Sequence, residues 1–254
     1  MRVDRCNNIG DFRSMARRRL PGPIFHYIDG AADDEVTYRR NTAAYERCDL
    51  VPNVLAGVES IDMSITVMGQ KIDMPLFCAP QLKNYVKEGS NISVSVGDYF
   101  STLLDQSMNW QDAADVRKKW GKQFCLKGIM SIADAKRAVD IGATAIMVSN
   151  HGGRQLDGSR SPFDQLAEIV DAVGDRIDVI CDGGITRGTH VLKALSVGAK
   201  ACSGGRLYLY ALAAAGQAGV ERALENLRAE IERDMKLMGC RSVDQLSRDN
   251  LRFR

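Results

Sequence analysis

The stretch "SNHGGRQLDG", residues 149–158, holds two side chains that could do chemistry together, His151 and Arg154. They follow an apolar run, residues 143–148, and share one loop, so both can point to one ligand. An imidazole can take a proton at neutral pH, and a guanidinium can hold a carboxylate through two parallel hydrogen bonds. The pair predicts a base and a carboxylate clamp, with a purely structural loop as the alternative.

Polar side chains also end the neighbouring strand-like runs. Lys127 follows "FCL", Ser149 follows "AIMV" and Asp182 follows "VIC". In parallel α/β folds the reactive groups gather at the carboxyl ends of the strands. A cation at the inner edge of a strand is costly unless it faces an anion. Lys127 therefore predicts an anionic ligand, and its alternative partner is a carboxylate of the core.

Two glycine-rich endings, "DGGITRG" and "SGGR", each run toward the expected start of a helix. Backbone N–H groups exposed at glycine, together with the helix dipole, form a phosphate cradle, and the last two strands of a barrel commonly supply one. Tight strand-to-helix turns are the alternative. Because the two motifs fall on adjacent strands and the second ends in Arg206, the sequence favours phosphate binding.

These residues need a parallel sheet to bring them together, and the sequence pattern predicts one. From residue 124 onward, strand-like runs alternate with helical periodicity, as in a barrel or a doubly wound sheet. The expected strands are residues 123–129, 144–150, 177–183 and 199–204, and the expected helices are 132–141, 162–173 and 187–197. Before them we expect helices at 12–20 and 33–45, a short one within "LPGPIFHYIDGAA", a hairpin turning near Gly69 and Gln70, and then a strand. Helical patterns at 111–119 and 207–238, the latter as one helix or two, complete the prediction.

Composition excludes several classes of protein. With 254 residues, 45% apolar and 26% charged, the chain can bury a full core. A net charge of +2 gives no sign of a nucleic-acid partner, and the arginine-rich residues 13–19 are expected to form a solvated helix face. Seven cysteines without a C-x-x-C pair are expected to be buried and to bind no metal. The longest apolar run, residues 207–215, is too short to cross a bilayer, so we expect a cytoplasmic protein and leave peripheral contact with the inner membrane open.

The stretch "LKGIMSIADAKRAVDIGATAIMVSNHGGRQLDGSRSPFDQLAEIV", with "VICDGGITRGTHVLKALSVGAKACSGGRLYLYAL", closely resembles the FMN-dependent L-2-hydroxy acid dehydrogenases and oxidases. That family includes glycolate oxidase, L-lactate dehydrogenase and mandelate dehydrogenase. "LPGPIFHYIDGAADDE" and "MPLFCAP" resemble it too. The resemblance implies a TIM (β/α)₈-type barrel holding FMN, as a single domain over residues 1–254 with an N-terminal helical and hairpin segment, 1–72.

The resemblance also implies roles for individual residues. His151 would be the catalytic base, and Tyr27 and Arg154 would bind the substrate carboxylate. Lys127 would stabilise the anionic reduced flavin. The other residues expected to bind the cofactor are Ala79, Pro80, Ser149, Asp182, Gly183, Gly184, Gly205 and Arg206. Thr186 stands where the family usually has a phosphate-binding arginine, so Arg187, one residue further on, is the replacement that we expect.

The chain departs from the family in length. A barrel takes roughly 30 residues for each of its eight strand–helix units. The run ending at Pro80 matches the first strand of the family, and the run at Phe124 matches the fifth. About three units are thus missing near residues 80–82, including the aspartate that orients the base histidine in the family. The expected fold is an incomplete barrel, with strands matching 1 and 5–8 and two unpaired sheet edges.

Two functions remain open from the sequence. The first is FMN-dependent oxidation of a small L-2-hydroxy acid, most of all L-lactate, with oxygen, a quinone or a cytochrome as electron acceptor. The family is often tetrameric, so we expect a homo-oligomer. The second is a catalytically impaired remnant that binds phosphate or a partner chain. A barrel enzyme of the inosine-monophosphate dehydrogenase type is a third reading, but the sequence lacks its catalytic cysteine loop.

Overall fold

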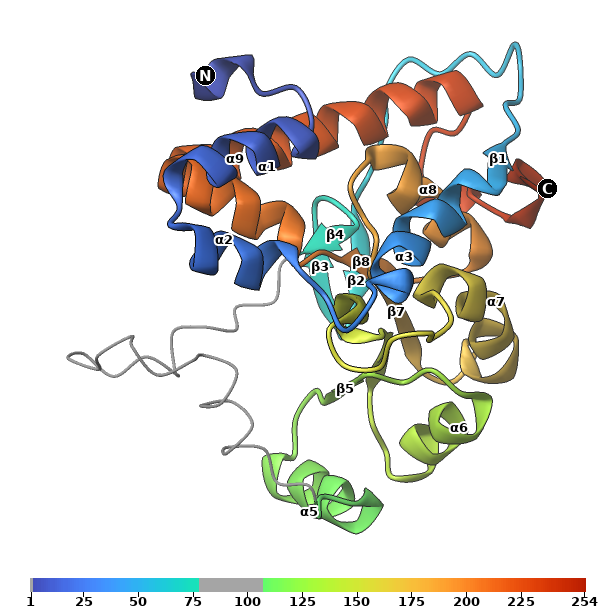
Figure 1. Ribbon diagram of the computed structural model, residues 1–254. Helices are drawn as coiled ribbons and strands as arrows, with labels where there is room; N and C mark the ends of the chain where they lie inside the picture. Colours follow the sequence, from blue (N-terminus) through green and yellow to red (C-terminus); the bar gives the residue numbers. More distant parts are fainter. Residues whose placement is uncertain (1, 78–106) are drawn as a thin grey trace.

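A parallel sheet of five strands forms the centre of the computed structural model, which describes residues 2–77 and 107–254 (Figure 1). The strand order is β4-β8-β7-β6-β5. The bounds are β4 (Leu76–Phe77), β5 (Cys125–Lys127), β6 (Ala145–Val148), β7 (Asp178–Asp182) and β8 (Ala201–Ser203). β6 and β7 are almost wholly buried because apolar layers cover both faces, as parallel sheets require.

Three helices connect these strands and cover the sheet's outer face: α6 (Ile132–Asp140), α7 (Pro162–Val173) and α8 (Gly188–Val197). Ser131 and Ser161 begin α6 and α7 by accepting a hydrogen bond from the backbone N–H three residues on. The register pairs Cys181 of β7 with Cys202 of β8. Because β5, β6, β7 and β8 are parallel, their carboxyl ends lie at the same end of the sheet, and the polar motifs that follow them can share one site.

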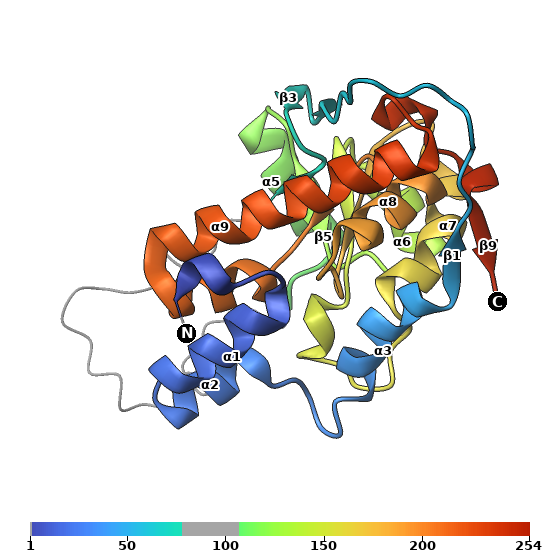
Figure 2. The ribbon, with the colours of Figure 1, turned by 90° about the horizontal axis from the view of Figure 1, so that it is seen from above.

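The N-terminal helices are α1 (Ile9–Arg19), α2 (Gly22–Asp29) and α3 (Val36–Glu46), and the C-terminal helix is α9 (Arg206–Met238). Of the N-terminal helices, α1 and α2 pack against the long C-terminal one, whereas α3 packs against α7 and the His151 loop (Figure 2). α9 breaks at Ala215 and Gly216, where the backbone leaves helical geometry, and Arg19 donates a hydrogen bond to the Ala214 carbonyl at that break. The sequence allowed one helix or two, and the structure has one element with a break.

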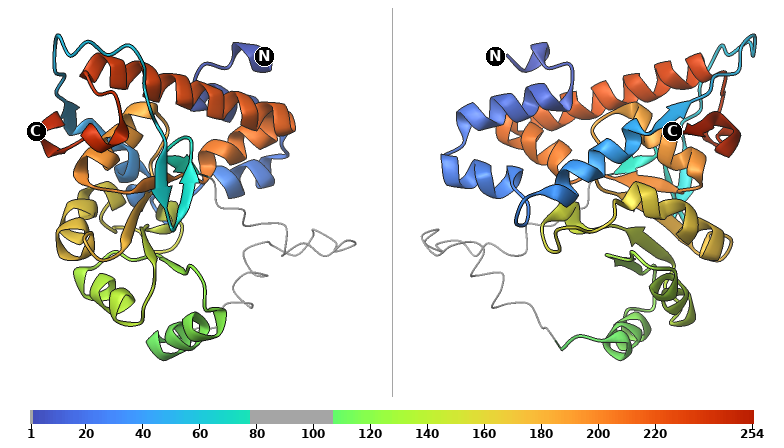
Figure 3. Two further views of the ribbon diagram at one scale, coloured as in Figure 1. Left: turned by 180° about the vertical axis from the view of Figure 1, so that it is seen from behind. Right: turned by 45° about the vertical axis from the view of Figure 1, so that its right-hand side comes forward.

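Two small antiparallel pairs complete the described chain (Figure 3). The hairpin of β2 (Ile65–Val67) and β3 (Gln70–Ile72) turns at Met68 and Gly69, where it was expected, and Met68 N–H donates to Asp178 at the start of β7. The pair of β1 (Cys48–Leu50) and β9 (Leu251–Phe253) was not predicted. The remaining elements are η1 (Val3–Arg5), η2 (His151–Gly153), η3 (Val243–Gln245), η4 (Arg248–Asn250) and α5 (Trp110–Trp120).

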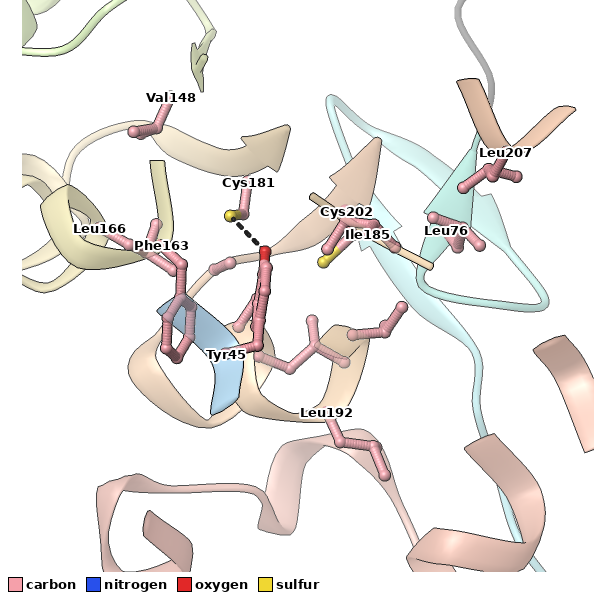
Figure 4. Close-up of a cluster of buried hydrophobic side chains, with 14 of the residues drawn as sticks. Tyr45, Leu76, Val148, Phe163, Leu166, Cys181, Ile185, Leu192, Cys202 and Leu207 are labelled. Carbon is pink, nitrogen blue, oxygen red and sulfur yellow. Dashed lines mark hydrogen bonds between the residues drawn. The ribbon is translucent and has the colours of Figure 1, made fainter. Parts of the chain in front are cut away.

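Tyr45 of α3 is the largest fully buried side chain and joins α3, α7 and α8 to the sheet (Figure 4). Its ring stacks on Phe163 at 4.3 Å and on His190 at 4.5 Å between centroids. Its hydroxyl lies 3.5 Å from the Cys181 sulfur and donates to the Gly183 carbonyl at 3.3 Å. This contact fixes the turn after β7 from behind.

Within the described residues the sheet does not close. β4 and β5 each have one strand neighbour, so the sheet is an incomplete barrel with two free edges. α5, next in the chain before β5, has no buried residue, and Val116 and Trp120 are exposed on it. The predicted fold, an incomplete α/β barrel of five strands, is confirmed.

The prediction that the cysteines are buried holds for five of the six in the described residues. Cys6, Cys48, Cys181, Cys202 and Cys240 are buried and unpaired, and Cys125 is half-buried. Within residues 2–77 and 107–254 no helix combines the length and apolarity of a membrane span.

Candidate functional site

Three polar side chains converge where β5, β6 and β7 end. Lys127 Nζ lies 2.9 Å from Ser149 Oγ and 3.1 Å from Asp182 Oδ2. Ser149 Oγ donates to the same Asp182 oxygen at 2.6 Å and accepts the His151 backbone N–H at 3.1 Å. The core carboxylate that the sequence allowed as the alternative partner of Lys127 is thus Asp182. Because the Lys127 side chain is 29% exposed and an ammonium has three donors, a ligand can still reach it.

His151 stands at the rim of this cluster in a left-handed backbone conformation, with φ of 55°. The residue is exposed, and within the described part of the chain its imidazole has no hydrogen-bond partner. Partial desolvation and the cations Lys127 and Arg154 lower the pKa of His151, against the opposite effect of Asp182. The imidazole is therefore neutral at pH 7 and can accept a proton.

The loop that carries His151 is clamped onto α3. Asn150 Oδ1 accepts the Gly153 N–H at 3.2 Å and the Asn41 amide at 2.8 Å, and Asn150 Nδ2 donates to Asn41 Oδ1 at 2.7 Å. A Cβ at Gly153 would lie 2.7 Å from the Tyr38 nitrogen. Glycine is required there by φ of 74° and by this close approach.

The end of the same loop caps α3. Asp157 accepts the backbone N–H groups of Thr37 at 2.7 Å and of Val36 at 3.2 Å, and these bonds lower the pKa of Asp157 to about 2. A carboxylate is favourable at a helix N-terminus because it satisfies free donors and the helix dipole. The motif "SNHGGRQLDG" is therefore partly structural, and Asn150 and Asp157 carry that part.

Arg154 and Tyr27, the predicted carboxylate ligands, are brought together. The Arg154 guanidinium carbon lies 4.6 Å from the centroid of the Tyr27 ring, and Nη1 donates to the carbonyls of Tyr27 and Gly30. No carboxylate pairs with Arg154 within residues 2–77 and 107–254. An acid ligand would supply the missing charge.

In the turn after β7, two glycines lie close to neighbouring helices, a packing role that the sequence did not predict. A Cβ at Gly184 would lie 2.2 Å from the Asn41 carbonyl oxygen, and one at Gly183 would lie 3.0 Å from Pro162. These glycines are needed because α3 and α7 press on the turn. The Asp182 carboxylate, an acceptor when ionised, suits hydroxyl groups rather than a phosphate.

Arg187, for which the sequence predicted a phosphate contact, is paired in the structure with a carboxylate of the chain itself. Its guanidinium pairs with Glu230 of α9 at 3.0 Å, and the other oxygen of Glu230 accepts the Gly188 N–H at 2.7 Å. The protein's own carboxylate thus occupies the N-terminus of α8, the position predicted for the phosphate, and Arg187 is held away from that role. Glu230 lies in the expected C-terminal helix, but its burial and this capping are seen only in the structure.

In the second glycine turn, the backbone at Gly205 is open to a ligand, whereas the Arg206 side chain is engaged by carbonyls of the chain. A Cβ at Gly205 would meet nothing within 4 Å, so the start of α9 is open there. Arg206, by contrast, donates to the carbonyls of Ile28 at 3.0 Å, Gly152 at 2.9 Å and Gly30 at 2.6 Å. The predicted contacts Ala79 and Pro80 lie outside the described residues.

Sequence reasoning missed three residues that shape the site: Asn41, Asp157 and Glu230. Each of the three forms hydrogen bonds with a segment that is distant in the sequence. For Asn41 the local spacing of residues therefore gave no signal. Within the described ranges no cluster of three or more metal-ligating side chains is present.

The sequence model described as FMN-dependent dehydrogenase matches residues 16–83 and 81–253 of this chain. The chain belongs to this family. Its members are enzymes, and its cofactor is FMN. The two matched segments meet at residues 81–83, where the sequence predicted the join.

Curated relatives share most of the chain. It is 50% identical to the pre-mycofactocin synthase of Mycobacterium tuberculosis, with 91% of each protein covered. It is 29% identical to a peroxisomal (S)-2-hydroxy-acid oxidase of Oryza sativa subsp. japonica, covering 96% of this chain and 95% of that protein. The alignments extend over 359 and 348 residues, more than the 254 of this chain, so these relatives carry residues that it lacks.

Solved structures share the fold. The flavin-binding domain of baker's yeast flavocytochrome b2 matches with a TM-score of 0.89 and 27% identity, over 99% of this chain and 88% of that one. The (S)-mandelate dehydrogenase of Pseudomonas putida matches with a TM-score of 0.85 and 25% identity, over 98% and 99%. The family therefore supports FMN-dependent oxidation of 2-hydroxy acids in general.

The described residues fit one end of FMN and not the other. Lys127 and Asp182 present a donor and an acceptor at the carboxyl ends of β5 and β7, which suits the polar edge of a flavin ring. At the phosphate end, Arg187 and the start of α8 are taken by Glu230, and Arg206 is bonded to backbone carbonyls. In this structure Arg187 and Arg206 are thus engaged by groups of the chain itself, and the predicted phosphate contacts at Gly183, Gly184, Arg187 and Arg206 stay a prediction.

Proposed function

We propose that this protein oxidises a small L-2-hydroxy acid to the 2-oxo acid, with L-lactate as the first substrate to test. The observation that carries the proposal is geometric: His151 and Arg154 share one loop, and the Arg154 guanidinium, which pairs with no carboxylate of the described residues, lies over the Tyr27 ring. The choice of lactate is supported by 28% identity to the yeast L-lactate dehydrogenase (cytochrome), over 98% of this chain and 61% of that protein.

Each of these side chains has a defined task in such a reaction. Arg154 and Tyr27 bind and orient the substrate carboxylate. Oxidation of the hydroxyl-bearing carbon releases two electrons and two protons, and an imidazole nitrogen of His151 accepts one of those protons. Lys127 offsets the charge of Asp182, so that Arg154 leaves the site positive, which favours an acid substrate. FMN, when bound, would accept the two electrons together with the second proton.

A second candidate follows from the relatives. Identity to the pre-mycofactocin synthase is 50%, against 28% to the lactate dehydrogenase, so the substrate could instead be that of the mycobacterial enzyme. On sequence identity alone this second substrate is favoured.

One experiment separates these functions. The purified chain is mixed with FMN, freed of excess, and treated without oxygen with L-lactate, D-lactate or the substrate of the mycobacterial synthase. Loss of the visible flavin band with L-lactate alone supports the first candidate, and loss with the synthase substrate alone supports the second. A chain that takes up no FMN is the catalytically impaired remnant, and both candidates are then wrong.

A further inference from the structure

Arg206 is a partly buried arginine that makes no ion pair with a carboxylate of the described residues. Its three nitrogens donate instead to three backbone carbonyls: Nε to Ile28, Nη1 to Gly152 and Nη2 to Gly30. Its guanidinium carbon lies 4.4 Å from the centroid of the Tyr38 ring. The planar fork of an arginine can hold several acceptors at once, as a lysine cannot.

The three carbonyls belong to the segments that carry the predicted substrate residues. Gly152 directly follows His151, and Ile28 and Gly30 flank the end of α2, which carries Tyr27. Gly30 O also accepts Arg154 Nη1 at 3.0 Å, so both arginines meet on one carbonyl. Arg206 therefore ties the His151 loop to α2 at the point where Arg154 sits.

Glycine at position 152 is explained by the same contact. Its φ is 67°, and a Cβ there would lie 2.7 Å from Arg206 Nη1. The first glycine of "HGGR" thus admits the guanidinium, and the second, Gly153, admits α3. The close fit on both sides indicates that the loop is built around Arg206.

We propose that Arg206 is a positioning residue that sets the His151 loop against α2, and that it is not a ligand of the cofactor phosphate. Three of the five N–H groups of the guanidinium are taken by these carbonyls, so a phosphate would find one N–H on each Nη and would compete with the bonds that hold the loop. The positioning itself stands apart from the proposed function, and only its effect on turnover rests on that function.

The test uses Arg206→Gln and Arg206→Lys, with Arg187→Gln as the matched control, because Arg187 was also predicted to bind phosphate and contacts neither segment. The chain has three histidines, so their imidazole signals can be followed by NMR in the flavin-free protein. We expect both Arg206 variants to move the His151 signal, to leave His190 in place and so to show a folded core, and the control to leave His151 unmoved.

Flavin affinity gives the second readout. A phosphate ligand distinguishes FMN from riboflavin, which lacks the phosphate, whereas a positioning residue affects both equally. We expect Arg206→Gln to weaken FMN and riboflavin by the same factor. An unmoved His151 signal, or a loss of FMN affinity about tenfold greater than that of riboflavin, would overturn the proposal. If neither flavin binds, the NMR result alone decides.

Discussion

Asn41 and Asn150 form a reciprocal amide pair, in which each side chain donates to the other at 2.8 and 2.7 Å. Asn150 also accepts the Gly153 N–H and donates to the Arg160 carbonyl, so its hydrogen-bonding capacity is fully used. Asn41 is 1% exposed and its own carbonyl abuts Gly184. One buried residue of α3 therefore supports both the His151 loop and the turn after β7.

Asn41→Leu should destabilise the protein, because it leaves the half-buried amide of Asn150 without two of its partners. We expect the free energy of unfolding to fall by about 1–3 kcal/mol in urea denaturation. Asn226→Leu is the control, since Asn226 makes one half-buried bond, to the Cys6 carbonyl. An equal decrease of the unfolding free energy in the two variants would show that the Asn41–Asn150 pair stabilises the protein no more than a single half-buried hydrogen bond.

Gly153→Ala tests the close approach of the loop to α3. Gly142 is the matched control, because its φ of 77° resembles the 74° of Gly153 while nothing lies within 4 Å of its Cβ position. Alanine at position 142 should cost only the backbone strain, about 1–2 kcal/mol. Alanine at 153 should cost about 1–3 kcal/mol more, because the Tyr38 backbone must move. A loss at 153 no greater than at 142 would contradict the packing described.

The sequence predicted the sheet well because its cues are local. Glycine and serine punctuate each strand–helix unit, and the predicted bounds of α7, residues 162–173, match the structure. The pairing of β1 with β9 was missed because it joins residues about 200 positions apart and neither strand exceeds three residues. No local pattern specifies such a pair.

The site was predicted in part for the same reason. The positions of Lys127, Ser149 and His151 followed from strand ends, which periodicity reveals. The partners did not follow, since Arg187 meets Glu230 and Arg206 meets carbonyls of α2 and the His151 loop only through tertiary packing. The glycine motifs were interpreted as a phosphate cradle, but the close packing of neighbouring helices also requires glycine at Gly183 and Gly184.

Removing Lys127 should raise the pKa of His151. Lys127 opposes protonation of the imidazole, and its loss also frees the Asp182 charge, which favours it. Lys127→Met should therefore move the NMR titration of His151 upward in pH, and Asp182→Asn should move it downward. Because His151 acts in its neutral form, any turnover should follow the same shifts in its acid limb. Shifts of the same sign in both variants would exclude this electrostatic account.

His190 should make the fold sensitive to acid. Burial lowers the pKa of His190 from 6.5 to about 4, with Lys193 and Arg187 acting in the same direction. The folded state thus binds fewer protons between these pH values, so its stability is complete above about pH 6.5 and falls by about 3 kcal/mol toward pH 4.

His190→Phe provides the check on that acid sensitivity. Phenylalanine keeps the stacking on Tyr45 and cannot titrate, although it loses the contact with the Gly184 carbonyl. The variant should be less stable at pH 7 and should show a flatter dependence of unfolding free energy on pH. If the unfolding free energy of the variant depends on pH as strongly as that of the unaltered protein, His190 is not the group responsible for the acid sensitivity.

The most direct measurement is anaerobic bleaching of the FMN-loaded chain by a candidate substrate, with the variant His151→Gln measured in parallel. The account predicts that the unaltered protein loses its visible flavin band with L-lactate or with the substrate of the mycobacterial synthase, and that the variant holds FMN but keeps its colour. Bleaching at the same rate in both proteins, or none with either substrate, would contradict it.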